Sequence, residues 1–431
     1  MTLPMSRSAR GLTPDQRNAF TAALLGWTMD AFDYFLVVLV YADIAKDFGV
    51  SLTRMAFLTT ATLIMRPIGA FIFGRWADKV GRRRPLMVDV TFYSVVGFAC
   101  AFAPNFTVLL ILRMLYGIGM GGEWGLGAAL AMEKVPPERR GFYSGVLQQG
   151  YAVGYMLAAI AYLVLLPGFK DLGITPWRGL FAFSLLPALV SLYIRSKVGE
   201  SEAWERTRDR VAQTKVKAST VFRQPAILKR FVYLVLLMTA FNWMSHGTQD
   251  VYSTFLKKGE HFSTDSALYV TIIFNIGALI GGTLLGAWSQ SFGRRRTIMV
   301  AAFLGLFVVP VFSGALGTSF GILAFGSFLM QFCVQGAWGV IPAHLTEMSP
   351  DEIRGFYPGV TYQLGNCLAA FNLPIQEHLA KTHSYTFALS ATIVPVFLVV
   401  IVLAALGSER REARFGTDET SIAQTVAARS G

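Results

Sequence analysis

The sequence predicts an all-α integral membrane protein in which twelve transmembrane helices form two pseudo-symmetric six-helix bundles. Three observations lead to this fold class: an apolar composition, a series of long apolar runs, and a loop signal that occurs twice. Hydrophobic residues make up 54% of the 431 residues and charged residues only 15%, with a mean hydropathy of +0.49. A soluble protein of this length needs fewer apolar residues to fill its core, so the additional apolar residues indicate contact with a lipid bilayer.

The apolar residues fall into about twelve stretches of roughly 20 residues, the length with which a helix crosses a hydrocarbon layer about 30 Å thick. We expect six spans in residues 19–195, the first centred near Val37, and six more in residues 231–407. Residues 1–18 and 408–431 are expected to form polar tails, and residues 196–230 a basic linker at the membrane surface.

A loop signal between apolar runs is present in two copies. Residues 74–84 (GRWADKVGRRR) recur 212 positions later as residues 286–296 (GAWSQSFGRRR). Residues 133–145 (EKVPPERRGFYSG) match residues 347–359 (EMSPDEIRGFYPG) at a shift of 214. Two copies of a membrane bundle related in this way indicate a site that lies between the halves.

The distribution of basic residues predicts the orientation. The net charge of +12 is compatible with nucleic acid binding, but the positions of the 38 Lys and Arg residues favour membrane topology, and we expect no nucleic acid partner. The tails, the linker and alternate loops hold 29 of them, and the opposite loops hold seven. The positive-inside rule then places both termini in the cytoplasm of a multi-pass protein in the plasma membrane, the inner membrane of a bacterium.

The sequence lacks the usual signals of an enzyme or an ATP-driven pump. Cys100, Cys333 and Cys367 lie dispersed in apolar runs, a set that indicates neither a disulfide framework nor a metal site. No phosphate-binding P-loop, Gly-x-Ser-x-Gly turn or His-Glu-x-x-His helix is present. We therefore expect no metal and no cofactor.

The duplicated loop, the span count, the basic linker and the motif Arg113-x-x-x-Gly117-x-Gly119 together resemble the major facilitator superfamily over essentially the whole chain. The resemblance implies the major facilitator fold and a bundle interface gated by the duplicated loops. The gating candidates are Gly74, Asp78, Gly81, Arg82, Gly293 and Arg294.

The chemistry of the first loop fits such a gate. Gly74 and Gly81 allow close packing and a tight turn, and Asp78 can sit against a neighbouring helix end. The second copy has Gln290 in place of Asp78, so we expect one charged latch and unequal contributions of the two halves to closure. A simple topology anchor is the alternative role for the arginines.

The seventh apolar run contains the sharpest polar group, because polar side chains are costly inside a membrane. It reads NWMSHGTQDVYST over residues 242–254, and positions 242, 246, 250 and 254 share one helical face. His246 and Asp250 are one turn apart, where the carboxylate favours the protonated imidazole and desolvation opposes it. The pair is a candidate for proton coupling, with a static buried pair as the alternative.

This run resembles the Asn-x-x-Ser/Thr-His-x-Ser/Thr-Gln-Asp-x-x-x-Thr pattern of fungal-type lactate permeases, in the sialate:proton symporter branch of the superfamily. Residues 362–366 (YQLGN) resemble the same branch. The resemblance assigns carboxylate transport to Asn242, His246, Asp250, Gln363 and Asn366. Residues 29–33 and 121–125 also resemble sialic-acid members, but the chain lacks the two extra spans of some sialate transporters, which favours small monocarboxylates.

Further charged residues inside the spans complete the candidate site. Arg113 is the best candidate to bind a carboxylate, because arginine can donate two parallel hydrogen bonds to it, and a structural role is the alternative. Arg66 needs a partner, which Asp30 or Asp33 can supply. These two acids are candidate proton sites or members of a charge network. Glu123 is a candidate second proton site or part of a fixed ion pair.

Three glutamines, Gln249, Gln331 and Gln335, suit an oxygen-rich ligand, and helix–helix hydrogen bonds are their alternative role. Five aromatic positions rank lower, as packing or cavity walls: Tyr116, Tyr151, Tyr155, Trp243 and Trp338.

These features predict a proton-coupled symporter, functional as a monomer in the lipid bilayer, for a small organic anion such as lactate or pyruvate. A lone anion entering a negative interior is opposed by about 2.3 kcal/mol per 100 mV, whereas an anion with one proton carries no net charge. The proton is the coupling ion, and the two halves rock around the site. The alternatives are a transporter of sialic acid, another acidic sugar or an aromatic acid, a membrane enzyme, and a receptor that binds without transport.

Overall fold

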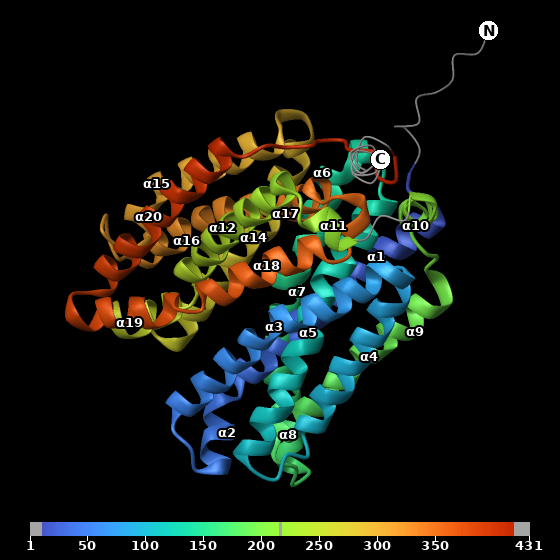
Figure 1. Ribbon diagram of the computed structural model, residues 1–431. Helices are drawn as coiled ribbons and strands as arrows, with labels where there is room; N and C mark the ends of the chain where they lie inside the picture. The colour runs from blue at the N-terminus through green and yellow to red at the C-terminus, as the bar shows by residue number, and fades with distance from the viewer. Residues whose placement is uncertain (1–10, 215–217, 418–431) are drawn as a thin grey trace.

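The computed structural model describes residues 11–214 and 218–417 (Figure 1). Within these ranges every regular element is a helix, and no strand occurs. In this part of the chain, ten helical segments are long and apolar enough to cross a membrane. Helix α4 and the consecutive helices α18 and α19 complete the twelve crossings, so the predicted all-α fold class is confirmed.

The N-terminal bundle contains the first six crossings, of which the fifth and the sixth are each built from two consecutive helices. The short 3₁₀ turns η2 (Pro137–Arg139) and η3 (Phe183–Leu185) lie within these two crossings. The helices are α1 (Pro14–Leu39), α2 (Tyr41–Phe48), α3 (Leu52–Val80), α4 (Arg83–Cys100), α5 (Phe106–Lys134), α6 (Arg140–Gln148), α7 (Gly150–Asp171), α8 (Pro176–Ala182) and α9 (Pro187–Lys197).

Helix α1 differs from its prediction. It begins at Pro14, inside the tail predicted for residues 1–18, and Val37 lies in its last turn rather than at its centre. Thr13 and Gln16 form a capping box that starts the helix in polar sequence, so the helix is longer than its apolar run. The remainder of that predicted tail, residues 1–10, lies outside the described residues.

The linker predicted for residues 196–230 is itself largely helical. It contains α10 (Glu202–Thr214) and α11 (Ala218–Phe222). The next membrane helix, α12, begins at Pro225, before the predicted boundary at 231, because a proline at the first helical position starts a helix well in polar sequence. The linker is thus shorter than predicted.

The C-terminal bundle contains the other six crossings. It includes the π-helical turn η4 (Phe255–Gly259) and the 3₁₀ turn η5 (Asp351–Ile353). The α-helices are α12 (Pro225–Gln249), α13 (Tyr252–Thr254), α14 (Thr264–Phe292), α15 (Arg294–Phe312), α16 (Phe320–Trp338), α17 (Ile341–Met348), α18 (Tyr357–Ala369), α19 (Asn372–Thr382) and α20 (Tyr385–Leu406).

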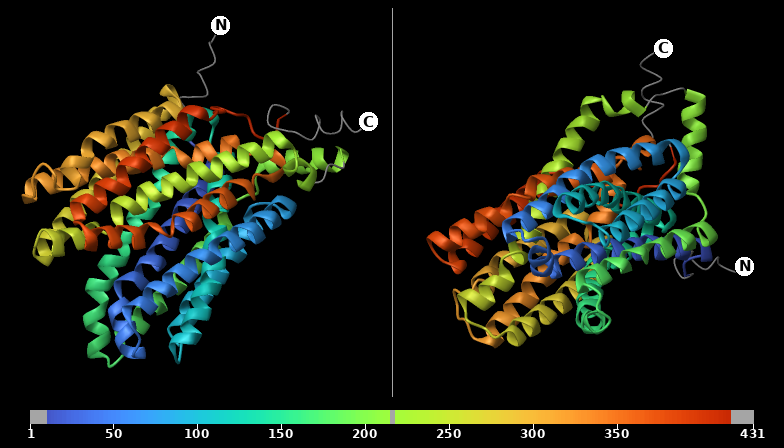
Figure 2. Two further views of the ribbon diagram at one scale, coloured as in Figure 1. Left: turned by 60° about the vertical axis from the view of Figure 1, so that its left-hand side comes forward. Right: turned by 90° about the horizontal axis from the view of Figure 1, so that it is seen from below.

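The two bundles meet at one end and diverge toward the other (Figures 1 and 2). We call the end that carries α10, α11 and the start of α1 the terminal face, and the opposite end the distal face. Contacts between bundles join α14 to α6, α18 to α3 and α5, and α17 to α5 and α6. At the distal face, α2 and α8 of one bundle lie apart from α19 of the other in both figures.

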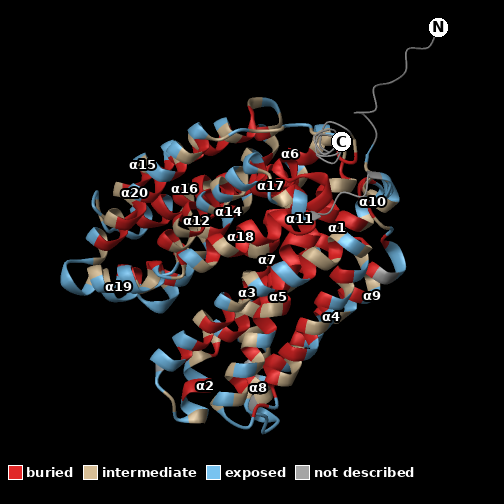
Figure 3. Cartoon of the chain, in the orientation of Figure 1, coloured by how far each residue is buried: buried red, intermediate tan, exposed pale blue. Residues whose placement is uncertain are grey.

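Residues coloured as exposed lie along the outer helices of both bundles (Figure 3), and large apolar residues are numerous among the exposed positions. Leu163, Val164 and Phe307 are each more than 60% exposed, although they lie in the middle of long helices. Exposed apolar surface of this extent suits contact with lipid rather than water. The chain is therefore a multi-pass membrane protein.

Candidate functional site

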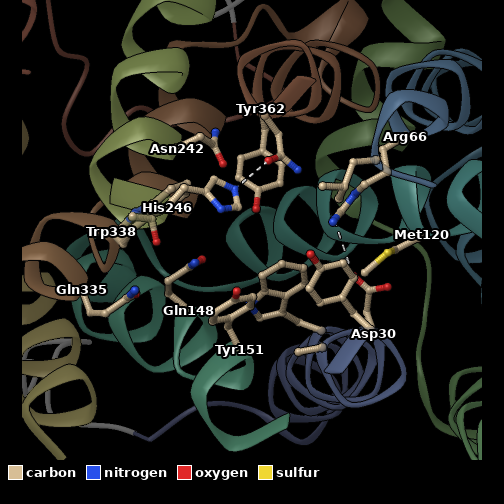
Figure 4. A pocket seen from close by; sticks show the side chains of 16 residues that line it. Asp30, Arg66, Met120, Gln148, Tyr151, Asn242, His246, Gln335, Trp338 and Tyr362 are labelled. Carbon is tan, nitrogen blue, oxygen red and sulfur yellow. Dashed lines mark hydrogen bonds and ion pairs between the residues drawn. The ribbon is translucent and has the colours of Figure 1, made fainter. Parts of the chain in front are cut away.

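A polar cavity of about 50 Å³ lies between the two bundles (Figure 4). Both bundles contribute to its walls, as the duplicated sequence predicts for a site between halves. The lining residues are Trp27, Asp30, Ala31, Tyr34, Leu63, Arg66, Met120, Gln148 and Tyr151 of the N-terminal bundle, and Asn242, Ser245, His246, Gln335, Trp338, Tyr362 and Asn366 of the C-terminal bundle.

The wall formed by the N-terminal bundle contains an ion pair. Arg66 Nη2 of α3 lies 3.7 Å from Asp30 Oδ2 of α1, and the two side chains are 6% and 0% exposed. Asp30 thus supplies the partner that the sequence predicts for Arg66. Among the described residues, no side chain or backbone group hydrogen-bonds Arg66 Nε or Nη2. Both atoms are buried, and Arg66 is one of the residues that line the cavity.

The wall formed by the C-terminal bundle contains the predicted histidine. His246 Nδ1 lies 3.2 Å from both carboxylate oxygens of Asp250, and its Nε2 lies 3.2 Å from Asn366 Oδ1 of α18. Both ring nitrogens face oxygen atoms, and an imidazolium donates to both of them. Figure 4 shows His246 and Arg66 on opposite sides of the cavity.

The predicted polar face of the seventh crossing contributes two residues to the cavity. Asn242 and His246 line the cavity, and Asp250 continues the register, since its N–H donates to the His246 carbonyl at 3.0 Å. Asp250 lies outside the lining but acts electrostatically on Tyr34 and Tyr151 of the other bundle. Helix α12 ends at Gln249, and Thr254 is the last residue of the short helix α13 that continues the crossing.

Aromatic rings enclose the cavity between the two polar walls. Trp27 stacks on Tyr151 with ring centroids 5.8 Å apart. Tyr362 stacks on Trp124 at 4.3 Å and meets Trp338 edge to face at 5.7 Å. Of the predicted aromatic positions, Tyr151 and Trp338 line the cavity, whereas Tyr116, Tyr155 and Trp243 do not.

Arg113, the predicted carboxylate ligand, is absent from the lining. Its guanidinium lies 3.9 Å from the Tyr116 ring centre and 6.0 Å from that of Phe181, and the residue is 2% exposed. Asp33 faces Arg113, Tyr116 and Ser184 inside the same bundle. The two residues predicted as site members thus belong to a buried group within the N-terminal bundle, because α8 brings Phe181 over the arginine.

Glu123 is buried against α1. A Cβ at Gly26 would lie 2.3 Å from Glu123 Oε1, so the glycine makes room for this carboxylate. Within the described residues, neither carboxylate oxygen of Glu123 has a hydrogen-bond partner, and the same holds for Asp89 of α4. Glu123 interacts electrostatically with Asp30 and Arg66, so the predicted fixed ion pair is not formed as a direct contact.

The predicted glutamines divide between the cavity and the helix interfaces. Gln335 lines the cavity. Gln331 Nε2 donates to Thr248 Oγ1 at 3.0 Å, and Gln249 Nε2 donates to Gln331 Oε1 at 3.4 Å, which is the helix–helix alternative. Gln363 is fully buried, and its amide has no partner among the described residues.

Five polar or aromatic residues of the lining were not named as site candidates from the sequence: Trp27, Tyr34, Gln148, Ser245 and Tyr362. Gln148 was detectable as an amide within an apolar run, and Tyr34 as a neighbour of Asp33. No group of three or more His, Cys, Asp or Glu that could hold a metal occurs in residues 11–214 and 218–417.

At the terminal face, the first copy of the duplicated loop joins the bundles. A Cβ at Gly74 would lie 2.7 Å from Phe356 Cα, so only glycine permits this approach, and Gly81 ends α3 at a φ of 101°. Asp78 Oδ1 accepts a hydrogen bond from the Gly355 N–H at 2.7 Å, directly before α18. Asp78 therefore contacts the end of a neighbouring helix, as predicted.

Arg82 holds this loop to its own bundle. Its Nη2 lies 3.0 Å from Glu133 and its Nη1 lies 3.4 Å from Asp78. Burial opposes the charge, but Glu133 and Asp78 outweigh it and raise the pKa of the Arg82 guanidinium above its ordinary value. We call Asp78, Arg82 and Glu133 the N-terminal latch.

The second copy of the loop repeats this arrangement, and we call Gln290, Arg294 and Glu347 the C-terminal latch. Gly293 ends α14 at a φ of 109°. Gln290 Oε1 accepts a hydrogen bond from the Gly141 N–H of the other bundle at 2.9 Å. Arg294 donates to Glu347 through Nε at 3.0 Å and Nη2 at 2.9 Å.

The prediction of one charged latch concerns the charge of Asp78, and the two loops nevertheless make the same kind of contact across the boundary. A carboxamide oxygen accepts a backbone N–H as a carboxylate does, so Gln290 reaches across the boundary as Asp78 does. Two ion pairs cross the boundary as well, Arg354 with Glu133 at 3.6 Å and Arg140 with Glu347 at 4.0 Å. The halves differ in the charge of one latch residue, not in the contact it makes.

The sequence profile of the Major Facilitator Superfamily matches residues 22–282 and 252–429, which together cover most of the chain. The chain belongs to this superfamily. A carboxylic acid transporter protein homolog of Saccharomyces cerevisiae is 30% identical over 394 residues, which are 87% of this chain and 63% of that protein. The chain thus spans less than two thirds of that relative's length.

Two further proteins agree with the family. A sialic acid transporter of Escherichia coli is 28% identical over 400 residues, which are 92% of this chain and 93% of that protein. The solved structure of the proton:xylose symporter XylE aligns with a TM-score of 0.76 over 93% of this chain and 98% of that one, and its 18% identity shows the fold alone. These proteins are transporters and not enzymes, and this superfamily member is a transporter.

Proposed function

We propose that this protein is a proton-coupled symporter of a small monocarboxylate, of the size of lactate or pyruvate, that works by alternating access as a monomer. The observation that carries the proposal is the buried Arg66, a cation in the lining of a cavity between the bundles that faces His246 across it. The proposal uses no metal and no cofactor; the proton is the coupling ion.

Anion binding is assigned to Arg66. A guanidinium can donate two parallel hydrogen bonds to a carboxylate, and the low dielectric of a cavity between membrane helices strengthens the pair. The Asp30 carboxylate at 3.7 Å balances the arginine when the site is empty. Tyr362, Asn242 and Gln148 surround the same space and suit the remaining oxygen atoms of a hydroxy or keto acid.

Proton coupling is assigned to His246. Its contacts to Asp250 and Asn366 are both satisfied when the ring is charged, and one of them weakens when a proton leaves. A protonated His246 adds a second positive charge to the wall opposite Arg66, so an anion binds better to the protonated carrier. Loss of the anion and of the proton are then linked.

The size of the cavity supports a short acid. A cavity needs roughly 10–15 Å³ to hold one water, so a cavity of about 50 Å³ has room for ordered water that a short monocarboxylate displaces. The yeast relative is a carboxylic acid transporter homolog, which agrees with this class. The second candidate is sialic acid, another acidic sugar or an aromatic acid, because a sialic acid transporter is a relative and aromatic rings enclose the site.

The conformation supports a direction for the cycle. The latches join the bundles at the terminal face, and the charge distribution favours a cytoplasmic terminal face in the inner membrane of a bacterium. The cavity then receives proton and anion from outside. Rocking of the bundles breaks the latches and releases both inside.

The test is uptake by purified protein in sealed proteoliposomes with an imposed inward proton gradient. We expect uptake of radiolabelled lactate or pyruvate that collapses when a protonophore removes the gradient, and that unlabelled sialate or nicotinate inhibits weakly. Arg66→Gln is the matched inactive control, because it removes the charge and keeps a donor. Uptake that does not depend on the proton gradient contradicts the proposed coupling. Stronger inhibition by sialate or nicotinate than by unlabelled lactate or pyruvate contradicts the proposed substrate.

A further inference from the structure

The segment after α20 runs across the terminal face and inserts an aromatic ring between the bundles. Phe415 is 5% exposed, although it lies in a polar part of the chain. Its ring centre is 3.6 Å from Arg140 Cζ and 3.9 Å from Arg354 Cζ. Arg140 begins α6 in the N-terminal bundle and Arg354 precedes α18 in the C-terminal bundle, so one ring spans the boundary.

Hydrogen bonds that join side chains to the backbone of this segment hold it to three parts of the molecule. Arg140 Nη1 donates to the Ala413 carbonyl at 2.5 Å, in the N-terminal bundle. The Gly416 N–H donates to Asp351 Oδ2 at 3.0 Å, in the C-terminal bundle. Arg210 Nη2 of α10 donates to the Gly416 carbonyl at 2.8 Å. Residues 413–417 are therefore fastened to both bundles and to the linker.

The two arginines that clamp the ring are equivalent in the duplicated sequence, 214 residues apart. Each also reaches the glutamate of the opposite latch, Arg354 with Glu133 and Arg140 with Glu347. Two guanidiniums close together repel each other, and the negative face of an aromatic ring between them offsets that repulsion. Phe415 thus completes a chain of contacts that runs from one latch to the other.

We propose that residues 413–417 form a strap that holds the terminal face closed, and that the Phe415 ring is the part of the strap that contacts both bundles. The proposal rests on the alternating-access cycle proposed above. When the bundles part at the terminal face, Arg140 and Arg354 separate, so the ring cannot contact both. The strap must release from at least one bundle before the cavity opens to that side, and the C-terminal segment thereby sets how often it opens.

The expected effect follows from the strength of a cation–π contact. Losing a buried contact of this kind shifts a two-state equilibrium by roughly tenfold. Phe415→Ala should therefore raise the ratio of terminal-open to terminal-closed molecules by about ten. Phe415→Trp should keep the closed state, because indole is at least as good a partner for a cation.

The experiment measures distances between spin labels at Lys79 and Ser291, which are exposed at the terminal ends of α3 and α14 in different bundles. Both labels are placed in a variant whose three cysteines are replaced by alanine, reconstituted in nanodiscs without substrate. We expect a longer-distance population that grows in Phe415→Ala and not in Phe415→Trp. Ser408→Ala, at an exposed position of the same segment, is the control and should match the parent.

Phe415→Leu separates the aromatic clamp from simple packing, because leucine keeps apolar volume without a π face. A shift in Phe415→Leu supports the clamp, and it still decides the question if Phe415→Ala does not fold. Parental distances in both variants would overturn the strap. The readout needs no transport, so failure of every acid to enter proteoliposomes refutes the proposed function while leaving this measurement valid.

Discussion

The two bundles differ in the middle of the membrane and agree at the terminal face. Around the cavity, the N-terminal bundle contributes the ion pair of Arg66 and Asp30, whereas the C-terminal bundle contributes amides, two hydroxyls and the titratable His246. At the terminal face both bundles present the same arginine–glutamate latch. The comparison indicates a division of labour: one wall supplies a fixed cation, the other a proton-dependent group, and the duplicated loops close the structure symmetrically.

The largest expected effect comes from the fixed cation. Arg66→Gln should lower uptake by about 100-fold or more, because it removes the anion's partner and leaves the Asp30 carboxylate buried without a counter-charge, a loss of roughly 3–5 kcal/mol. Arg66→Lys should restore part of the activity, since it keeps charge without the paired donors. Initial uptake rates in proteoliposomes at equal protein content measure both.

Arg113→Gln is the comparison that sharpens this prediction. Arg113 is buried against Tyr116 and outside the cavity, so its loss should reduce folded protein and leave the KM of the remaining transporter unchanged. A raised KM in Arg113→Gln, with a normal KM in Arg66→Gln, would assign anion binding to Arg113 and a structural role to Arg66.

The next effect tests the symmetry of the latches. Glu133→Gln removes one acid from Arg82 and from Arg354, which keep Asp78 and Asp351, whereas Glu347→Gln removes the acid that Arg294 and Arg140 share. Removing one partner of a buried ion pair costs roughly 3–5 kcal/mol, so both variants should lower the apparent melting temperature, and Glu347→Gln should lower it more. Thermal unfolding in nanodiscs measures this, and a loss confined to one variant would show that one bundle carries the closure.

A smaller effect, a decrease of about tenfold in uptake at acidic pH, is expected when His246 can no longer be protonated. His246→Gln keeps a hydrogen-bonding side chain but cannot take up a proton, so the residual uptake should no longer rise as the external pH falls. His378→Gln, at an exposed position on α19, should keep the parental pH profile. Retained pH dependence in His246→Gln would remove the proton assignment from this residue.

The fold and the seventh crossing were predictable from sequence because membrane physics acts on single residues and their neighbours. Apolar length predicts a span, and a polar stripe in such a span predicts a wet or paired face, as Asn242 and His246 confirm by lining the cavity. Gly74 and Gly81 were predictable for the same reason, since close approach and positive φ favour glycine.

The remaining errors concern contacts between distant parts of the chain. Arg113 and Arg66 look alike in sequence, and only the packing of Phe181 from α8 covers one while the other faces the cavity. The equivalence of Gln290 to Asp78 depends on Gly141 of the opposite bundle. Phe415 lies among charged residues with no periodicity, and its burial depends on distant parts of the chain: two arginines and an apolar cluster that includes Leu147 and Ala203.

The smallest expected effect concerns the one residue by which the latches differ. Asp78→Asn keeps an oxygen for the Gly355 N–H and loses the attraction to Arg82, so it should cost about 1 kcal/mol, the difference between a charged and a neutral hydrogen bond. That is about a fivefold rise in the terminal-open population, measured with the same spin-label pair. Asp78→Ala removes the acceptor itself and should shift the population further, as should Gln290→Ala. If Asp78→Asn equals Asp78→Ala, charge rather than the backbone contact holds the first loop. Gln290 has no charge, so it would then hold the second loop by a different interaction from the one that Asp78 makes at the matching position.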